Sequence, residues 1–133
     1  MLHIAKSTVA QLARYNKICI VRAPKDVLYI GTDMPVYSWN PHTNSYCPGV
    51  SSLGLKDTTL TFALNRKTLL ILMDSGPKYR IAFSTKESAR GTNCCAAEMS
   101  YGFIYGSHRV HLESVVKRTK LQTKTPKTMF TMY

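Results

Sequence analysis

Three strand-like stretches in the middle of the chain constrain the fold more than any other feature. Residues 58–64 alternate apolar with polar side chains, and residues 78–83 do so again, which is the pattern of a half-buried strand. Residues 68–73 are almost continuously apolar, as in a strand that is covered on both faces. Short turns rich in Asn, Asp, Ser, Gly and Pro separate the stretches, so they predict an antiparallel meander.

The same alternation predicts which side chains of the meander face the core. In the first and third stretches the large apolar side chains fall on one side, and Thr, Lys and Arg fall on the other. We therefore expect one common face for Leu60, Phe62 and Leu64, with Tyr79, Ile81 and Phe83 pointing inward and Lys78 and Arg80 outward.

A helix-start signal follows the meander directly. Ser84 and Glu87 match the S-x-x-E capping box, in which the two side chains bond each other's backbone N–H groups. This signal predicts a capped helix over residues 85–100. Gly91 and Asn93 lower its intrinsic propensity, so packing against the sheet must hold the helix in place.

Weaker signals complete the expected fold. Ser7 can cap a short N-terminal helix over residues 7–15, and a run of Pro, Gly, Asn and Ser predicts a long loop at 40–54. Further strands are expected at 17–22, 26–30, 35–39, 101–106 and 109–116. The whole predicts one α+β domain over 1–116, with an antiparallel sheet that is strongly curved or closes into a small barrel, and a basic tail over 117–133.

The charge balance predicts an anionic partner. Eighteen Lys and Arg face seven Asp and Glu, a net charge of +11, and no acid precedes Asp26 or follows Glu113. A protein this basic is attracted to nucleic acid or to an acidic protein surface, and with nucleic acid it would act by neutralising phosphates and releasing counterions. The expected contact residues are Arg66, Lys67, Lys78, Arg80, Lys117, Arg118, Lys120, Lys124 and Lys127.

Catalytic and metal-binding patterns are weak, so we expect no enzyme, no cofactor and no metal site. Adjacent Cys94 and Cys95 rarely ligate one tetrahedral ion together, and His108 and His111 would lie on opposite faces of the expected strand. Four thiols without a secretory signal predict reduced cysteines in the nucleus or cytoplasm. No apolar run is long enough for a transmembrane segment.

The stretch KYRIAFSTKESA (78–89) resembles the last strand and helix entry of the pleckstrin-homology-like superfamily. Within and before it, CCAAEM (94–99) and LARY (12–15) resemble the amino-terminal domain of the meiotic double-strand-break accessory family. That resemblance implies a domain that binds partner proteins and helps to recruit the break-forming machinery to chromosomes. The chain departs from the superfamily by a glycine inside the helix and by strand-like sequence after it. No phosphoinositide loop lies between its first two strands.

Two functional hypotheses remain open from the sequence. The first is a non-enzymatic adaptor domain that binds nucleic acid or an acidic protein within a larger assembly. The alternative is a small basic viral matrix or coat protein, or a ribonucleoprotein component, which self-assembles as a homo-oligomer, binds RNA and resides in the virion or particle. An adaptor should present an apolar patch at a sheet edge or on the helix, which distinguishes the two.

Overall fold

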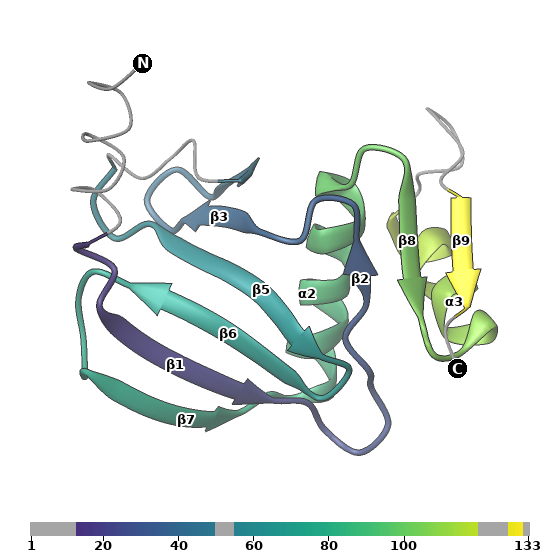
Figure 1. Cartoon of the computed structure of the whole chain (residues 1–133), viewed down its shortest axis with the longest axis horizontal. Coiled ribbons are helices and arrows are strands. Elements are labelled where there is room, and N and C mark those ends of the chain that lie inside the picture. Colours follow the sequence, from purple (N-terminus) through teal and green to yellow (C-terminus); the bar gives the residue numbers. More distant parts are fainter. Residues whose placement is uncertain (1–12, 50–54, 120–127, 132–133) are drawn as a thin grey trace.

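The structure is a computed structural model that describes residues 13–49, 55–119 and 128–131. A six-stranded sheet in the order β4-β3-β5-β6-β1-β7 dominates it, and a second sheet has the order β2-β8-β9 (Figure 1). The large sheet contains β1 (Lys17–Arg22), β3 (Tyr37–Asn40), β4 (Ser45–Pro48), β5 (Thr59–Asn65), β6 (Thr68–Met73) and β7 (Tyr79–Phe83). The remaining elements are β2 (Gly31–Thr32), α2 (Lys86–Met99), β8 (Phe103–Gly106), α3 (Arg109–Thr119) and β9 (Thr128–Thr131).

The expected α+β class with a mostly antiparallel sheet is confirmed, but the expected meander is wrong at its third strand. β5 and β6 form the predicted hairpin. β1 then pairs antiparallel with β6, and β7 pairs parallel with β1, so β7 lies at the edge of the sheet. The large sheet stays open, and no closed barrel forms among the described strands. β6 is flanked by β5 and β1, and the α2-facing side of the sheet is covered whereas the side of Leu70 is only half-buried, so the expectation of a strand covered on both faces is not met.

Several local predictions also need correction. Residues 45–48, expected inside a long loop, form β4 and pair with β3. Residues 26–30 are not a regular strand, and the backbone regains strand geometry only at β2. Residues 109–116, expected as a strand, belong to α3, so the boundary placed at residue 116 falls inside a helix. β9, within the segment expected as a tail, pairs in parallel with β8. The N-terminal helix expected at 7–15 lies mostly outside the described residues.

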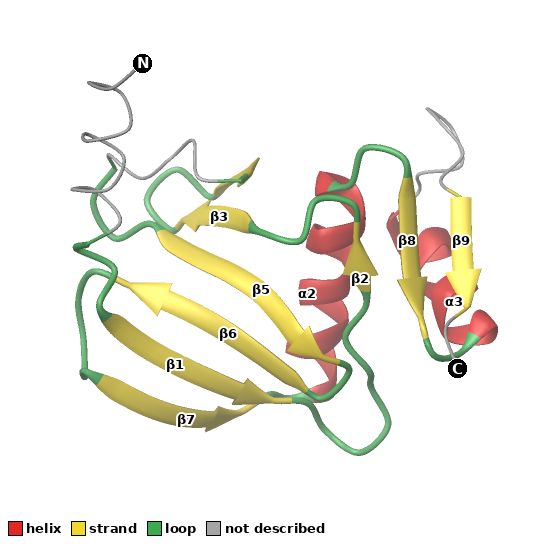
Figure 2. Ribbon diagram, viewed as in Figure 1, coloured by secondary structure: helices red, strands yellow, loops and turns green. Residues whose placement is uncertain are grey.

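Helix α2 forms where the capping signal places it, with a different N-cap. The Thr85 hydroxyl, rather than that of Ser84, accepts the backbone N–H of Ser88 at 3.1 Å. Glu87 lies in the first turn, where a carboxylate interacts favourably with the helix dipole. The helix lies between the two sheets in projection (Figure 2). Its Ala89 packs near Leu69, and its Ala97 packs near α3 and β8, so α2 joins the two parts of the core.

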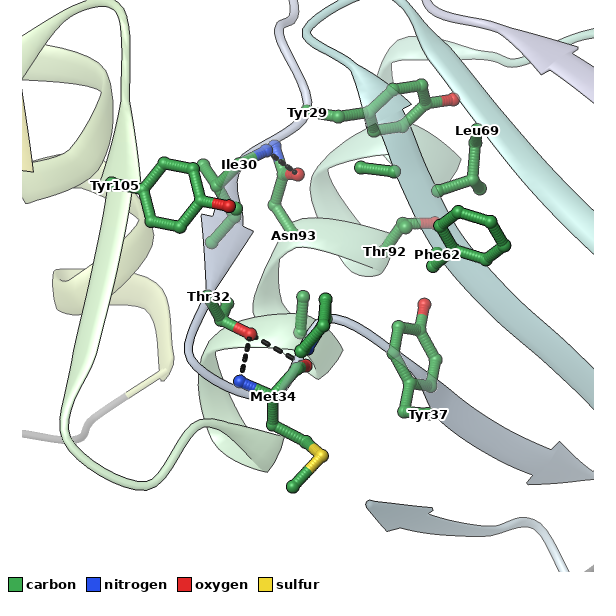
Figure 3. A pocket seen from close by; sticks show the side chains of 14 residues that line it. Tyr29, Ile30, Thr32, Met34, Tyr37, Phe62, Leu69, Thr92, Asn93 and Tyr105 are labelled. Carbon is green, nitrogen blue, oxygen red and sulfur yellow. Dashed lines mark hydrogen bonds between the residues drawn. The ribbon is translucent and has the colours of Figure 1, made fainter. Parts of the chain in front are cut away.

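A buried asparagine fastens α2 to the irregular segment before β2. The Asn93 side chain accepts the N–H of Ile30 at 3.1 Å (Figure 3). It also donates to the carbonyl of Leu28 at 2.8 Å. These bonds replace the strand ladder that residues 28 and 30 lack, which explains why a weak helix former is retained there. The cavity drawn in Figure 3 holds only about 40 Å³.

Candidate docking surface

The edge strand β7 exposes the side chains that alternation predicted to be inward. Tyr79, Ile81 and Phe83 are 62%, 55% and 82% exposed. Alternation correctly places them on one side of the strand, but α2 covers the other side of the sheet. Arg80 lies on that α2-facing side, in register with the buried Cys19.

The exposed β7 side chains continue an apolar sheet face. The register aligns Ile81 with Ile20, Leu70 and Phe62, and residues aligned across neighbouring strands share a face. Tyr15 covers one end of this face, where it packs with Leu60. We call the remainder the open face, which comprises Ile18, Ile20, Phe62, Leu70, Tyr79, Ile81 and Phe83. Contiguous exposed apolar surface of this kind marks an interaction site more often than isolated exposed residues do.

The backbone of β7 also offers hydrogen-bonding groups to a partner. The Ile18 N–H donates to the Lys78 carbonyl at 3.1 Å, and the Ser84 N–H donates to the Arg22 carbonyl at 2.9 Å. In a parallel pair these hydrogen bonds recur at every second residue, so the backbone N–H and C=O groups of the even-numbered residues of β7 point toward β1. The N–H and C=O groups of Tyr79, Ile81 and Phe83 therefore point to the outer edge, where none of the described strands pairs with them.

Cations outnumber acids around this surface, where Asp74 lies near Tyr15 and Glu87 belongs to the first turn of α2. β1 and the segment from residue 75 to 86 contain no Asp or Glu. Arg22 shares the face of Ile20, and its guanidinium donates to the Thr68 hydroxyl at 2.9 Å, which holds the charge beside the apolar strip. Lys78 precedes the strip at its other end. A partner with acidic side chains next to apolar ones would complement this arrangement.

The structure separates the nine predicted contact residues into several places. Arg80 belongs to β7 and Lys78 directly precedes it, whereas Arg66 and Lys67 form the β5–β6 turn at the end of the sheet opposite to Lys78. Six residues of β6 span roughly 20 Å between these ends. The Lys67 ammonium donates to the carbonyls of Pro24, Lys25 and Val27, at 2.8, 3.1 and 3.1 Å, so it fastens a loop.

The remaining predicted cations lie near the end of the chain. Lys117 and Arg118 occupy the last turn of α3, where positive charge stabilises a helix C-terminus. Arg118 shares a shallow surface pocket with Arg90. Lys120, Lys124 and Lys127 lie outside the described residues.

Sequence reasoning missed Arg22 and Arg90 as partners of these sites. Arg22 had a usable signal, because it continues the every-second-residue pattern of Ile18 and Ile20. Arg90 had none, since its nearness to Arg118 depends on how α2 and α3 pack.

Cys94, Cys95 and His111 serve packing and hydrogen bonding in this geometry. Burial raises the pKa of the Cys94 and Cys95 thiols, so both are protonated at neutral pH and are poor nucleophiles. All four cysteines are free thiols. His111 Nε2 lies 2.7 Å from the Leu28 carbonyl, so this ring joins α3 to the segment that Asn93 holds. Within the described ranges, no group of three or more His, Cys, Asp or Glu side chains is arranged to hold a metal ion.

No helix in the described part of the chain has the length and apolar character required to cross a bilayer. Comparison with protein-family models, with curated proteins and with solved structures finds no match to this chain. Its resemblances to the pleckstrin-homology-like superfamily and to the meiotic accessory family therefore stay predictions.

Proposed function

We propose that this chain is a non-enzymatic adaptor domain that binds an acidic, partly apolar segment of a partner protein on β7 and the open face. The observation that carries the proposal is the exposure of Tyr79, Ile81 and Phe83 on a sheet edge with which no other described strand pairs. An extended segment that joined this edge would form main-chain hydrogen bonds with β7 and would bury the three side chains.

Charge selects the occupant of this edge. Lys17, Arg22 and Lys78 surround the apolar strip without any acid on β1 or β7. A second copy of the chain would bring its own +11 charge to the same edge, so the pairing of two such edges is opposed by repulsion. An acidic partner gains both the apolar burial and the ion pairs, which is why we favour it over self-assembly.

Nucleic acid is the weaker candidate partner for this surface. Phosphate binding needs cations along a continuous track, and the described cations are divided between β7, the β5–β6 turn and α3. Apolar side chains also contribute no binding energy toward a sugar-phosphate backbone unless bases stack on the aromatic rings. A nucleic-acid complex is therefore one outcome of the test below, and it would contradict the proposal.

The test uses two probes on isotope-labelled protein. The first is a short peptide that alternates valine with glutamate, and the second is a single-stranded oligonucleotide of equal net charge. We expect the peptide to shift the amide signals of β7 and β1 in NMR spectra and to protect the Tyr79, Ile81 and Phe83 amides from hydrogen exchange. A peptide of the same composition with its valines grouped together serves as the control and should bind more weakly.

A surface variant makes the assignment specific. Burying a phenylalanine contributes about 1.5–3 kcal/mol, so Phe83→Ser should weaken peptide binding about 10- to 100-fold. Because Phe83 is 82% exposed, the variant should keep its melting temperature. Val110→Ser, on an equally exposed apolar residue of α3, is the matched control and should leave binding unchanged. The proposal is wrong if neither probe binds, or if only the oligonucleotide binds.

A further inference from the structure

A second site lies on the other side of the large sheet. A hollow of about 430 Å³ separates the α2-facing side of the sheet from helix α2. Ligand pockets for small molecules usually measure about 300–1,000 Å³. The open face and this hollow lie on opposite sides of the same strands, so they are independent surfaces.

The walls of the hollow combine an apolar floor with aromatic and hydroxyl groups. Val21, Leu69 and Ile71 form part of the floor, and Trp39 and Tyr46 contribute rings that lie 6.2 Å apart between centroids. Burial, followed by the hydrogen bond to the Cys95 thiol, raises the pKa of Tyr46 to about 12, so its hydroxyl is neutral at physiological pH. Such a lining suits an apolar or aromatic ligand body.

One charged side chain lines this hollow, and it is a cation. Arg80 projects from β7 on the α2-facing side, and no Asp or Glu belongs to the lining. Arg80 takes part in none of the ion pairs between described side chains. A guanidinium stays charged at any physiological pH and can bind a carboxylate through two parallel hydrogen bonds.

Gly91 of α2 keeps the hollow accessible. A glycine inside a helix costs about 0.5–1 kcal/mol relative to alanine. Neither steric crowding nor backbone conformation explains a glycine here. A Cβ at Gly91 would meet nothing within 4 Å, and its backbone has ordinary helical geometry. The residue lines the hollow, so the missing side chain leaves room that a ligand can use.

We propose that this hollow binds a small amphiphilic anion, such as a medium-chain or aryl-alkyl carboxylate. The apolar body would lie on the Val21, Leu69 and Ile71 floor beside the Trp39 ring, and the carboxylate would pair with Arg80. This activity goes beyond the docking of a protein segment at β7, and it uses the opposite face of the sheet.

The sole tryptophan of the chain, Trp39, supplies the assay, because it belongs to the wall of the hollow. Dodecanoate, below its micelle concentration, is the probe in a fluorescence titration of the full chain. We expect a saturable one-to-one change in Trp39 emission. Dodecyltrimethylammonium, which has the same chain and the opposite charge, should bind at least tenfold more weakly, and dodecanol should fall between the two.

Two variants test the assignment from opposite ends of the ligand. Gly91→Leu should fill the hollow and weaken dodecanoate binding at least tenfold, while the melting temperature is unchanged or higher. Arg80 is exposed, so Arg80→Gln should fold normally. This variant should weaken the binding of dodecanoate at least fivefold and leave the binding of dodecanol unchanged. Phe83→Ser, on the opposite face, should have no effect on either ligand.

Three results would overturn this proposal. The first is the absence of saturable binding by dodecanoate. The second is equal binding of the anion and the cation, which would exclude a role for Arg80. The third is binding that survives Gly91→Leu but is lost in Phe83→Ser, which would place the probe on the open face. If Gly91→Leu fails to fold, the Arg80→Gln comparison between dodecanoate and dodecanol decides alone.

Discussion

The neighbouring cations Arg66 and Lys67 provide the sharpest test of the structure, because the sequence treats them alike and the fold does not. The Lys67 ammonium donates to three carbonyls of the loop after β1, whereas the Arg66 side chain has no hydrogen bond or ion pair with described residues. We predict that Lys67→Met lowers the free energy of unfolding, because it keeps the side-chain stem and leaves those carbonyls without their donor.

The size of this effect follows from the burial of the three bonds. Two of them are partly buried and one is exposed. Counting about 1 kcal/mol for each partly buried bond and nothing for the exposed one gives a loss of about 2 kcal/mol. In a domain of this size that loss corresponds to a decrease in melting temperature of about 6–10 °C.

Urea denaturation followed by far-UV circular dichroism measures the free energy, and calorimetry measures the melting temperature. Arg66→Met is the matched control, since the Arg66 carbonyl that accepts the Tyr29 N–H at 2.8 Å belongs to the backbone and is kept. We expect this control to change stability by less than about 0.5 kcal/mol. Equal effects of the two variants, or a Lys67→Met protein of full stability that has lost retention on phosphocellulose, would refute the reasoning.

Three further predictions concern the core and the pH dependence. Gly31→Ala should lower the free energy of unfolding by about 1–3 kcal/mol, because the added Cβ would overlap the Tyr105 ring. In a double-mutant cycle followed by calorimetry, Gly31→Ala should lower stability much less when Tyr105 is already alanine. Asn93→Leu should lower the free energy of unfolding by about 1–3 kcal/mol in urea denaturation, because it leaves the buried Ile30 N–H without an acceptor and removes one of the two side chains that bond the Leu28 carbonyl, while Asn93→Asp should retain only the bond to the Ile30 N–H. Burial holds the pKa of Tyr46 at about 12 in the folded protein against 10.0 ordinarily, so the contribution of this residue to the unfolding free energy should be constant well below pH 10 and should decline as the pH rises toward 12. Urea denaturation midpoints measured between about pH 9 and pH 12 should therefore decline less steeply with pH in Tyr46→Phe than in the unchanged protein.

The strands were predictable from the sequence where the pattern is local. β1 and β6 begin and end where their apolar runs do, because a strand of five or six residues between turn residues has few alternatives. The start of α2 was predictable within one residue from the same kind of local chemistry.

The pairing of the strands was not predictable from the sequence in the same way. Alternation in β7 separates its two faces but does not say which one is covered, and the large apolar side chains suggested the wrong answer. Their exposure follows from the position of β1 between β6 and β7, which depends on contacts between residues about 60 positions apart in the chain.

The second helix was missed because its composition misleads. Val110, Val115 and Val116 favour a strand on propensity, yet Leu112 and Val115 are three positions apart and both lie in the core beside Ile104. Tertiary packing outweighed the local preference. The candidate docking surface was invisible for a related reason, since exposure of an apolar strip requires knowledge of the neighbouring elements.

The position of β1 between β6 and β7 has a consequence for how the protein is made. β1 leaves the ribosome before either of the strands that flank it, and the register joins Ile18 to Tyr79 across 61 intervening peptide bonds. At 5–20 residues per second, this strand waits for roughly 3–12 s until its second neighbour has been synthesised. During that interval the nascent chain exposes an apolar strand with two unpaired edges, so its yield in cells should depend on chaperone capacity and on the speed of translation.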